Sequence, residues 1–436
     1  MYKIICSFFV ILVFLLTVGL MPVMAGEEEG RIETSGDIKV GAQQIGNNKT
    51  NSSKFNEYRD IKDGFYLYKF NLEGIDTQTG RYLEFRGKDL IRDDQNIILR
   101  LGSYGTWGLE IEWDETPHLL SNKAKTPYNY QGNGLYTVPA TAGVDMTTAG
   151  ASTTKDTTVS NYLNSYLHST DLGTQREKGR VALTYTPSPQ LKFKLEYSDE
   201  RKEGTQITGT PIGDRPPRTM NTQIPEPVDY HTRDLRFDAE YAGEWYQVQF
   251  SYLLSDFEND VTSLTWQSLF YNPTAGNYTT VEDGTTDRTY STYGRIALYP
   301  ENRYQNVALS FGVNLPLDSR LTATASYGLM EQDEDLLPYS YSTLTTNWDS
   351  TSRLPRQKAD AEIETTMFNV DYTINPIDRL NLRAFYRYYN LDNNTKTDEW
   401  YYVTSDASSN TAGGTAVNNQ RKNLAYGYKK QNFGLD

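Results

Sequence analysis

Three histidines, His118, His168 and His231, are the only imidazole side chains in the sequence and are the first candidates for acid–base or metal chemistry. His231 has Asp229 and Asp234 close by in the sequence, so a histidine–carboxylate dyad of the hydrolytic kind could form there. No serine or further acid stands in a recognisable motif around it, and all three histidines lie in loop-like sequence. We interpret them as polar loop residues and predict no catalytic residue and no enzyme.

The sequence also predicts no metal site and no cofactor-binding site. It contains no Cys-x-x-Cys-His haem motif, no His-Glu-x-x-His helix and no glycine-rich phosphate loop. Two acidic runs, at 256–260 and 331–335, could attract calcium or the cations that bridge lipopolysaccharide, but a solvated loop is the commoner explanation. Two further carboxylate pairs, Glu196/Glu200 and Asp238/Glu240, are explained by strand alternation as charges on one face of a strand.

Alternation with a period of two is the dominant pattern of the chain and is clearest in the hairpin 180–197. Apolar side chains occupy one side of its two arms, and polar side chains occupy the other. The apolar positions are Val181, Leu183 and Tyr185 in the first arm and Leu191, Phe193, Leu195 and Tyr197 in the second. Such a strand has one face in an apolar medium and one in a polar medium. The turn Pro187–Gln190 sets the register, and the same unit recurs at 235–254, 307–329 and 368–388.

Composition favours a transmembrane β-barrel over a secreted β-solenoid or β-sandwich. Mean hydropathy is −0.64, aromatic residues make up 13% and there are 34 tyrosines. After the leader, no run approaches the roughly 20 apolar residues that a spanning helix needs, whereas a barrel strand needs only about 9–11 alternating residues with aromatic girdles at its ends. A net charge of −14 argues against a nucleic-acid partner.

The chain divides into three expected segments. Residues 1–25 have the charged start, apolar run and small-residue cleavage site of a signal peptide, and this segment contains Cys6, the only cysteine. Residues 26–60 are expected to form a periplasmic N-terminal segment and a first strand region. Residues 61–436 are expected to form barrel strands with short periplasmic turns and long extracellular loops, with an irregular connection at 114–175 and a loop at 199–230 among them. About 13 candidate strands follow Gly64, an odd number, so we expect the chain to be an N-terminal part of a larger barrel, truncated at its C-terminus.

The first third of the chain resembles the MtrB/PioB outer-membrane proteins. The resemblance rests on the runs Phe55–Asp60, Asp63–Leu67, Gly102–Trp107, Asp114–Leu120, Thr126–Tyr128 and Gly132–Pro139. It implies a large outer-membrane barrel around a periplasmic multihaem, decahaem c-type cytochrome, for electron transfer with the cell exterior. An extracellular multihaem cytochrome and outer-membrane lipid are the other partners it implies. Some members carry a Cys-x-x-Cys near the mature N-terminus, which this chain lacks, and members are considerably longer.

The rival interpretation is a general diffusion porin for small solutes, and lumen size separates the two. With strands about 4.8 Å apart and tilted near 40°, roughly 24 strands give a barrel about 48 Å across, wide enough for a slender protein. About 13 strands give a lumen near 15 Å, which admits only solutes. A third alternative is a surface adhesin or enzyme barrel, but the sequence offers no motif for it.

Overall fold

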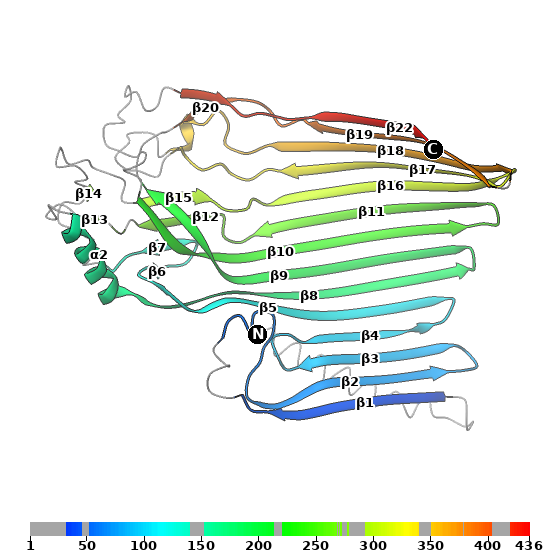
Figure 1. Ribbon diagram of the computed structural model, residues 1–436, viewed down its shortest axis with the longest axis horizontal. Coiled ribbons are helices and arrows are strands. Elements are labelled where there is room, and N and C mark those ends of the chain that lie inside the picture. The colour runs from blue at the N-terminus through cyan, green and yellow to red at the C-terminus, as the bar shows by residue number, and fades with distance from the viewer. Residues whose placement is uncertain are drawn as a thin grey trace.

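One twisted antiparallel sheet of 14 strands contains most of the residues that the structure describes (Figure 1). The computed structural model describes residues 32–45, 52–139, 152–212, 220–267, 269, 271–272, 277–278, 293–339, 350–377, 379–402 and 419–436. Neighbouring strands of the sheet follow the order of the chain, and every pairing is antiparallel. The outer strands β1 and β22 are the two edges of the sheet. The predicted all-β, transmembrane barrel class is confirmed.

The sheet strands are long, and most exceed the length that a bilayer requires. Their bounds are β1 (Ile32–Gln43), β2 (Gly64–Asp76), β3 (Arg81–Leu90), β4 (Asn96–Ser103), β5 (Trp107–Thr126), β8 (His168–Ser188), β9 (Leu191–Ile212), β10 (Met220–Ala242), β11 (Tyr246–Asn259), β16 (Asn302–Leu315), β17 (Ser319–Gln332), β18 (Ala361–Ile377), β19 (Leu380–Asn393) and β22 (Tyr428–Leu435). Tight turns join strands at the end where β8 meets β9, and long connections lie at the opposite end (Figure 1).

The four predicted hairpins are confirmed as β8–β9, β10–β11, β16–β17 and β18–β19. Their turn chemistry explains the register. Three residues, Pro316 to Asp318, connect β16 to β17, and Leu317 and Asp318 both have positive φ, at 63° and 47°, as short hairpin turns require. Ser319 donates its hydroxyl hydrogen bond to the carbonyl oxygen of Pro316 at 2.8 Å and closes the turn.

The two faces of the sheet differ in chemistry as the alternation predicts. Val181 and Leu183 are 42% and 45% exposed, whereas Ala182 between them is 4% exposed because charged neighbours crowd its face. On β5 the apolar face runs from Trp107 to Trp113, a distance of about 20 Å over six steps along the strand, which is the scale of the lipid-facing band between aromatic girdles. The apolar face is therefore the lipid-facing one, and the charged face points inward.

The strands extend well past the apolar band, and here the sequence interpretation was wrong. Residues 114–175 were expected to be an irregular connection, but β5 continues to Thr126 and β8 begins at His168. The stretch 199–230, also expected to be a loop, is largely β9 paired with β10. Beyond the apolar band both faces of the strands are exposed to water, so polar and apolar residues no longer alternate. The backbone hydrogen bonds between the strands nevertheless continue.

The strand count also corrects the expectation of an odd number. Thirteen strands of the sheet follow residue 63, but the segment 32–43 pairs with β2 along its whole length and makes the total 14. This strand lies in the segment expected to hold a first strand region, and a bulge between Lys39 and Val40 interrupts its alternation. Residues 52–60 lie beyond its far end, which is the end with the long connections.

A second, smaller sheet joins the long connections. It contains β6 (Asn129–Tyr130), β7 (Leu135–Thr137), β12 (Ser263–Gln267) and β15 (Tyr293–Ala297), in the order β15-β12-β7-β6. Its core consists of Tyr128, Tyr136, Val138, Ile224, Leu264 and Trp266. Ile224 belongs to β10, which pairs with β9 from Met220 to Tyr241 without a register shift. Ile224 therefore shares the inward parity of Arg236, and this small sheet, the cap, packs on the inward face of the extended β9–β10 hairpin.

Tight backbone approach holds the cap together. The amide of Thr265 donates to the carbonyl oxygen of Gly134 at 2.8 Å. Gly134 has a φ of +71°, and a Cβ there would lie 2.0 Å from the carbonyl oxygen of Ser263, so only glycine fits.

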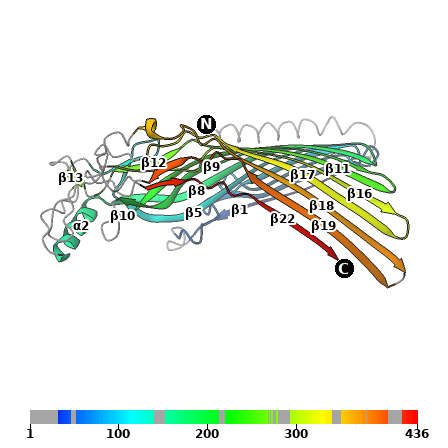
Figure 2. The same ribbon diagram turned by 90° about the horizontal axis from the view of Figure 1, so that it is seen from above.

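The remaining described elements are small and belong to the same end as the cap. They are the helix α2 (Ser152–Tyr166), the 3-10 turn η1 (Thr351–Arg353), and the pairs β13 (Tyr271–Asn272) with β14 (Asn277–Tyr278) and β20 (Glu399–Tyr402) with β21 (Asn419–Lys422). Seen from above, this end of the molecule is the one that carries α2, β12 and β13 (Figure 2). In the described part of the chain no helix has the length and apolar character to cross a membrane. The predicted signal peptide, 1–25, lies outside the described residues.

The face assignment gives a direct labelling prediction. Cysteine at position 193 should resist a water-soluble thiol reagent in membranes, because Phe193 lies on the apolar face, whereas cysteine at the neighbouring Lys194 should react. The mature chain offers no competing thiol if Cys6 leaves with the leader. Mass spectrometry of the labelled protein measures both yields. Equal labelling at the two positions would contradict the assignment.

Candidate functional site

The inward face of the sheet carries a continuous ladder of ion pairs across five adjacent strands. From β3 to β9 the ladder runs through Glu84, Arg100, Glu110, Arg180 and Glu196. Arg100 contacts Glu84 at 3.4 Å and Glu110 at 2.5 Å. Arg180 contacts Glu110, and its other guanidinium nitrogen lies 2.9 Å from Glu196. We call these residues the inward ladder.

Strand register creates the inward ladder. Arg100 is the direct partner of Glu84 on β3 and of Glu110 on β5, so side chains of opposite sign face each other across the sheet. On β8 the residue that pairs directly with Glu110 and Glu196 is Ala182, and Arg180 lies two residues before it. Because Ala182 is small, Arg180 has room to reach Glu110 on β5 and Glu196 on β9. Each charge is thus compensated by the wall itself, and the face is polar without a strong charge of one sign.

Beyond β9 the inward face becomes less charged. Arg236 contacts Asp238 at 2.8 Å, and the Ser251 hydroxyl donates to the same carboxylate at 2.6 Å. On β18 and β19, Arg383 holds Asp371 with two hydrogen bonds of 2.8 and 2.5 Å. Between them the inward positions within 306–312 of β16 and 322–328 of β17 are uncharged, and Ser310 and Thr324 share a hydrogen bond of 3.0 Å. The predicted carboxylate pairs Glu196/Glu200 and Asp238/Glu240 all lie on this inward face.

The histidines do not lie in loops as the sequence suggested. His118 is a β5 residue whose ring stacks on Tyr58 with centroids 4.6 Å apart, and it lies 3.4 Å from Glu57. His168 begins β8, and His231 lies within β10. His118 is therefore positioned as a structural contact between β5 and residues 52–60, and the three imidazoles lie on three different strands.

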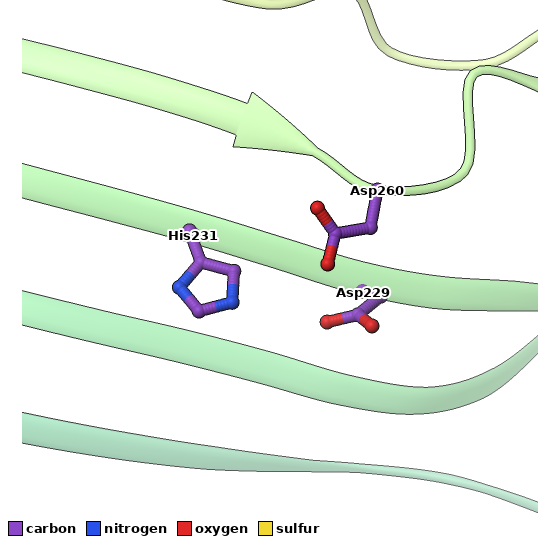
Figure 3. Close-up of side chains that lie close together, drawn as sticks. All are labelled: Asp229, His231 and Asp260. Atoms are coloured by element: carbon purple, nitrogen blue, oxygen red, sulfur yellow. The ribbon is translucent and has the colours of Figure 1, made fainter.

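His231 meets Asp229 but not Asp234. Asp229 and His231 project from one face of β10 beside Asp260, which follows the end of β11 (Figure 3). One ligand-type atom from each of the three lies within 4.8 Å of the others. Asp234 has the opposite parity and faces inward. Arg201 already binds Asp229 with two hydrogen bonds of 3.2 Å, so this cluster has no free carboxylate pair for a self-contained metal centre.

Two buried tyrosines, Tyr136 in the cap and Tyr162 in α2, have raised pKa values. Burial raises the pKa of the Tyr136 phenol, and burial raises the pKa of Tyr162 in α2 to about 12. Both phenols stay protonated at neutral pH, so neither is a general base. The cap is a packed structural unit built by segments far apart in the sequence: the amide of Val138 donates to the Gln267 side chain at 3.1 Å.

Sequence reasoning missed the inward ladder as a unit and missed the cap entirely. The sequence did contain a signal for the inward ladder. Its charged residues occupy polar positions of strands whose side chains alternate, namely Arg100, Glu110, Arg180 and Glu196. Their mutual contacts depend on which strands are neighbours, and the long connection between β5 and β8 hid that adjacency. The cap left no signal, since its strands have two to five residues.

Comparisons with known proteins agree with this architecture. The family model for outer membrane beta-barrel porins, MtrB/PioB, matches residues 47–436. Outer membrane protein MtrB of Shewanella baltica is 25% identical over 339 residues, which is 77% of this chain and 43% of the relative. The chain thus spans less than half of the length of that relative.

Two solved structures of outer-membrane proteins align over most of their length with low similarity. OmpT of Vibrio cholerae has a TM-score of 0.27 at 9% identity, covering 94% of this chain and 98% of that chain. The anion-selective porin of Comamonas acidovorans has a TM-score of 0.25 at 9% identity, covering 92% and 98%. At these TM-scores the alignments add nothing to the fold described above. The family match over most of the sequence, together with the two-faced antiparallel sheet, shows that the chain belongs to the MtrB/PioB family of outer-membrane β-barrel proteins.

Proposed function

We propose that this protein is an outer-membrane sheath that holds a periplasmic multihaem, decahaem c-type cytochrome across the membrane for extracellular electron transfer. Membership of the MtrB/PioB family supports the proposal. The observation that carries it is the inward ladder, whose charges pair with one another within the wall. Such a wall is wetted and polar, and it offers a protein guest many weak contacts instead of one binding pocket.

The roles of the barrel protein and the cytochrome follow from the distance dependence of electron transfer. Tunnelling decays steeply with distance, so the wall itself does not conduct across a bilayer and the haems of the guest must form the chain of carriers. The sheath positions this chain and excludes lipid from it. The long-connection end with the cap is where an extracellular multihaem cytochrome would dock as a second partner.

The test encloses a reducible dye in liposomes and supplies reductant outside. Liposomes that hold the barrel protein alone, the cytochrome alone, or both are compared. We expect dye reduction only with both proteins and copurification of the cytochrome with the barrel protein. If the barrel alone passes sugars or amino acids freely and the cytochrome adds no electron transfer, the diffusion porin is the correct function and the sheath is excluded.

Single charges of the inward face should contribute little to guest binding. Replacing Arg383 by alanine removes one ion pair with Asp371 on a wall where water solvates both charges, so one such pair adds little. We therefore expect the Arg383→Ala protein to retain the cytochrome with less than a tenfold loss of affinity, measured by titration in detergent. A complete loss would mean that the guest is held at one specific site instead of along the wall.

A further inference from the structure

The inward face of the sheet has sectors that differ in charge balance. On β3 to β10 each inward arginine has a carboxylate partner within the wall, and these arginines are Arg86, Arg100, Arg176, Arg180 and Arg236. The inward positions of β11, from Gln247 to Ser255, are uncharged, as are those within 306–312 of β16 and 322–328 of β17. This uncharged strip separates the compensated wall of β3 to β10 from β18, β19 and β22.

On the far side of the uncharged strip, cations are in excess. The inward charges of β17, β18, β19 and β22 are Arg320, Asp371, Arg383, Arg387 and Lys430. Arg383 binds Asp371 with two hydrogen bonds, and Asp436, which follows β22, lies 4.0 Å from the same guanidinium group. Within the described residues, Arg320, Arg387 and Lys430 form no ion pair. We call Arg320, Arg383, Arg387 and Lys430 the cationic sector.

An aromatic ring holds two arginines of the cationic sector without neutralising them. Phe385 shares their inward parity and lies between Arg383 and Arg387 along β19. The guanidinium carbons of these arginines lie 5.2 and 5.6 Å from the centre of its ring. An aromatic ring attracts a cation but leaves its charge available, unlike a carboxylate. The ring lies over Gly434 of β22, where a Cβ would collide with it, so glycine makes room for this arrangement.

A recess of about 480 Å³ lies beside Arg387. It is lined by the two unpaired cations Arg387 and Lys430, and by the amide side chains of Asn369 and Asn432, which are the direct neighbours of Arg387 on β18 and β22. The one acid among its lining residues, Asp371, is already bound by an arginine. Guanidinium, ammonium and amide groups all donate hydrogen bonds, and guanidinium matches the two oxygens of a carboxylate. The recess is therefore suited to carboxylate side chains of a partner.

We propose that the cationic sector binds an acidic surface of a protein through its aspartate and glutamate side chains. In the sheath this surface belongs to the cytochrome, an assignment that rests on the proposed function. The whole chain has a net charge of −14, so an acidic partner is repelled by most of the protein and attracted here. The other inward strands offer paired charges or none. The cationic sector therefore fixes the rotational orientation of a guest in the lumen.

The first experiment titrates the purified full chain, in detergent, with a fluorescent oligoglutamate peptide and measures anisotropy. The native protein should bind the peptide in about 0.01 M salt, where the Debye length is about 30 Å, and at least tenfold more weakly in about 1 M salt, where it is about 3 Å. The triple variant Arg320→Gln, Arg387→Gln and Lys430→Gln should bind at least tenfold more weakly than the native protein at the lower salt concentration.

Two control variants separate the charge of this face from total charge and from folding. Lys429→Gln makes the same change as Lys430→Gln one residue away, on the outward face of β22, and should leave peptide binding unchanged. The double variant Arg387→Lys with Lys430→Arg keeps both charges and should bind like the native protein. Native affinity in the triple variant, or a loss in Lys429→Gln as large as in the triple variant, would overturn the proposal.

A second experiment tests whether the acidic surface belongs to the cytochrome. A carbodiimide, which couples an amine to a carboxylate in contact with it, is added to the barrel protein with its copurified cytochrome. Mass spectrometry should find links from Lys430 to acidic residues of the cytochrome, and fewer from Lys192, an inward lysine of β9 that is 49% exposed and lies 3.9 Å from Glu240. No link from Lys430, or equal linkage of both lysines, contradicts the assignment. If no cytochrome copurifies, the proposed function fails, and the peptide titration still decides whether the cationic sector binds carboxylates.

Discussion

Placing an arginine at Phe193 should destabilise the folded protein in membranes by about 2–4 kcal/mol, because a lipid-facing charge near the middle of the apolar band has no water and no partner. Phe193 lies on β9 with Phe237 of β10 stacked beside it at a centroid distance of 6.3 Å, so the substitution also removes an aromatic pair. Equilibrium unfolding in urea, in lipid vesicles, measures the loss of free energy.

The matched control for Phe193→Arg places the same residue on the opposite face. Ser310 lies inward on β16, where its neighbours are the small residues of β17. Ser310→Arg should change the free energy of unfolding by much less than Phe193→Arg, since a charge on this face remains in water. Equal losses for the two variants would show that the apolar rows do not face lipid.

Replacing Trp266 by alanine should cost the cap about 3–5 kcal/mol, the usual loss when a large aromatic side chain is removed from a packed core. Trp266 is 1% exposed and packs with Tyr128, Tyr136 and Ile224. Because the cap adds to the end of the long strands, we expect it to open while the 14-stranded sheet stays folded. Limited proteolysis should then cut near β7 and β12, and the heat resistance of the sheet should persist.

The control for the cap is Trp245→Ala in the turn between β10 and β11. This tryptophan is 60% exposed and lies at the opposite end of the sheet from the cap. Its removal should leave proteolysis of the cap unchanged. If Trp266→Ala abolishes folding of the whole protein, the cap is instead a nucleus on which the large sheet depends.

The sequence alone determined the parts of this protein where a strand lies between lipid and water. There the two faces of each strand meet different media, so residues such as Leu183 and Thr184 must alternate, and the hairpins, their turns and the lipid-facing rows followed from that pattern. The outer-membrane class followed from the same strands and from the aromatic composition.

Only the tertiary structure decided what happens beyond the apolar band. There both faces of β5, β8, β9 and β10 are exposed to water, so their sequences do not alternate. For this reason the sequence did not show that the strands continue, or that His231 is a strand residue. The cap joins Thr265 to Leu135, and the inward ladder joins Glu84 to Glu196 through the strands between them; these contacts depend on strand adjacency and register across long connections. The local sequence pattern reflects whether each side chain faces lipid or water. Contacts between distant segments depend instead on the register of the strands in the sheet, which the local pattern does not contain.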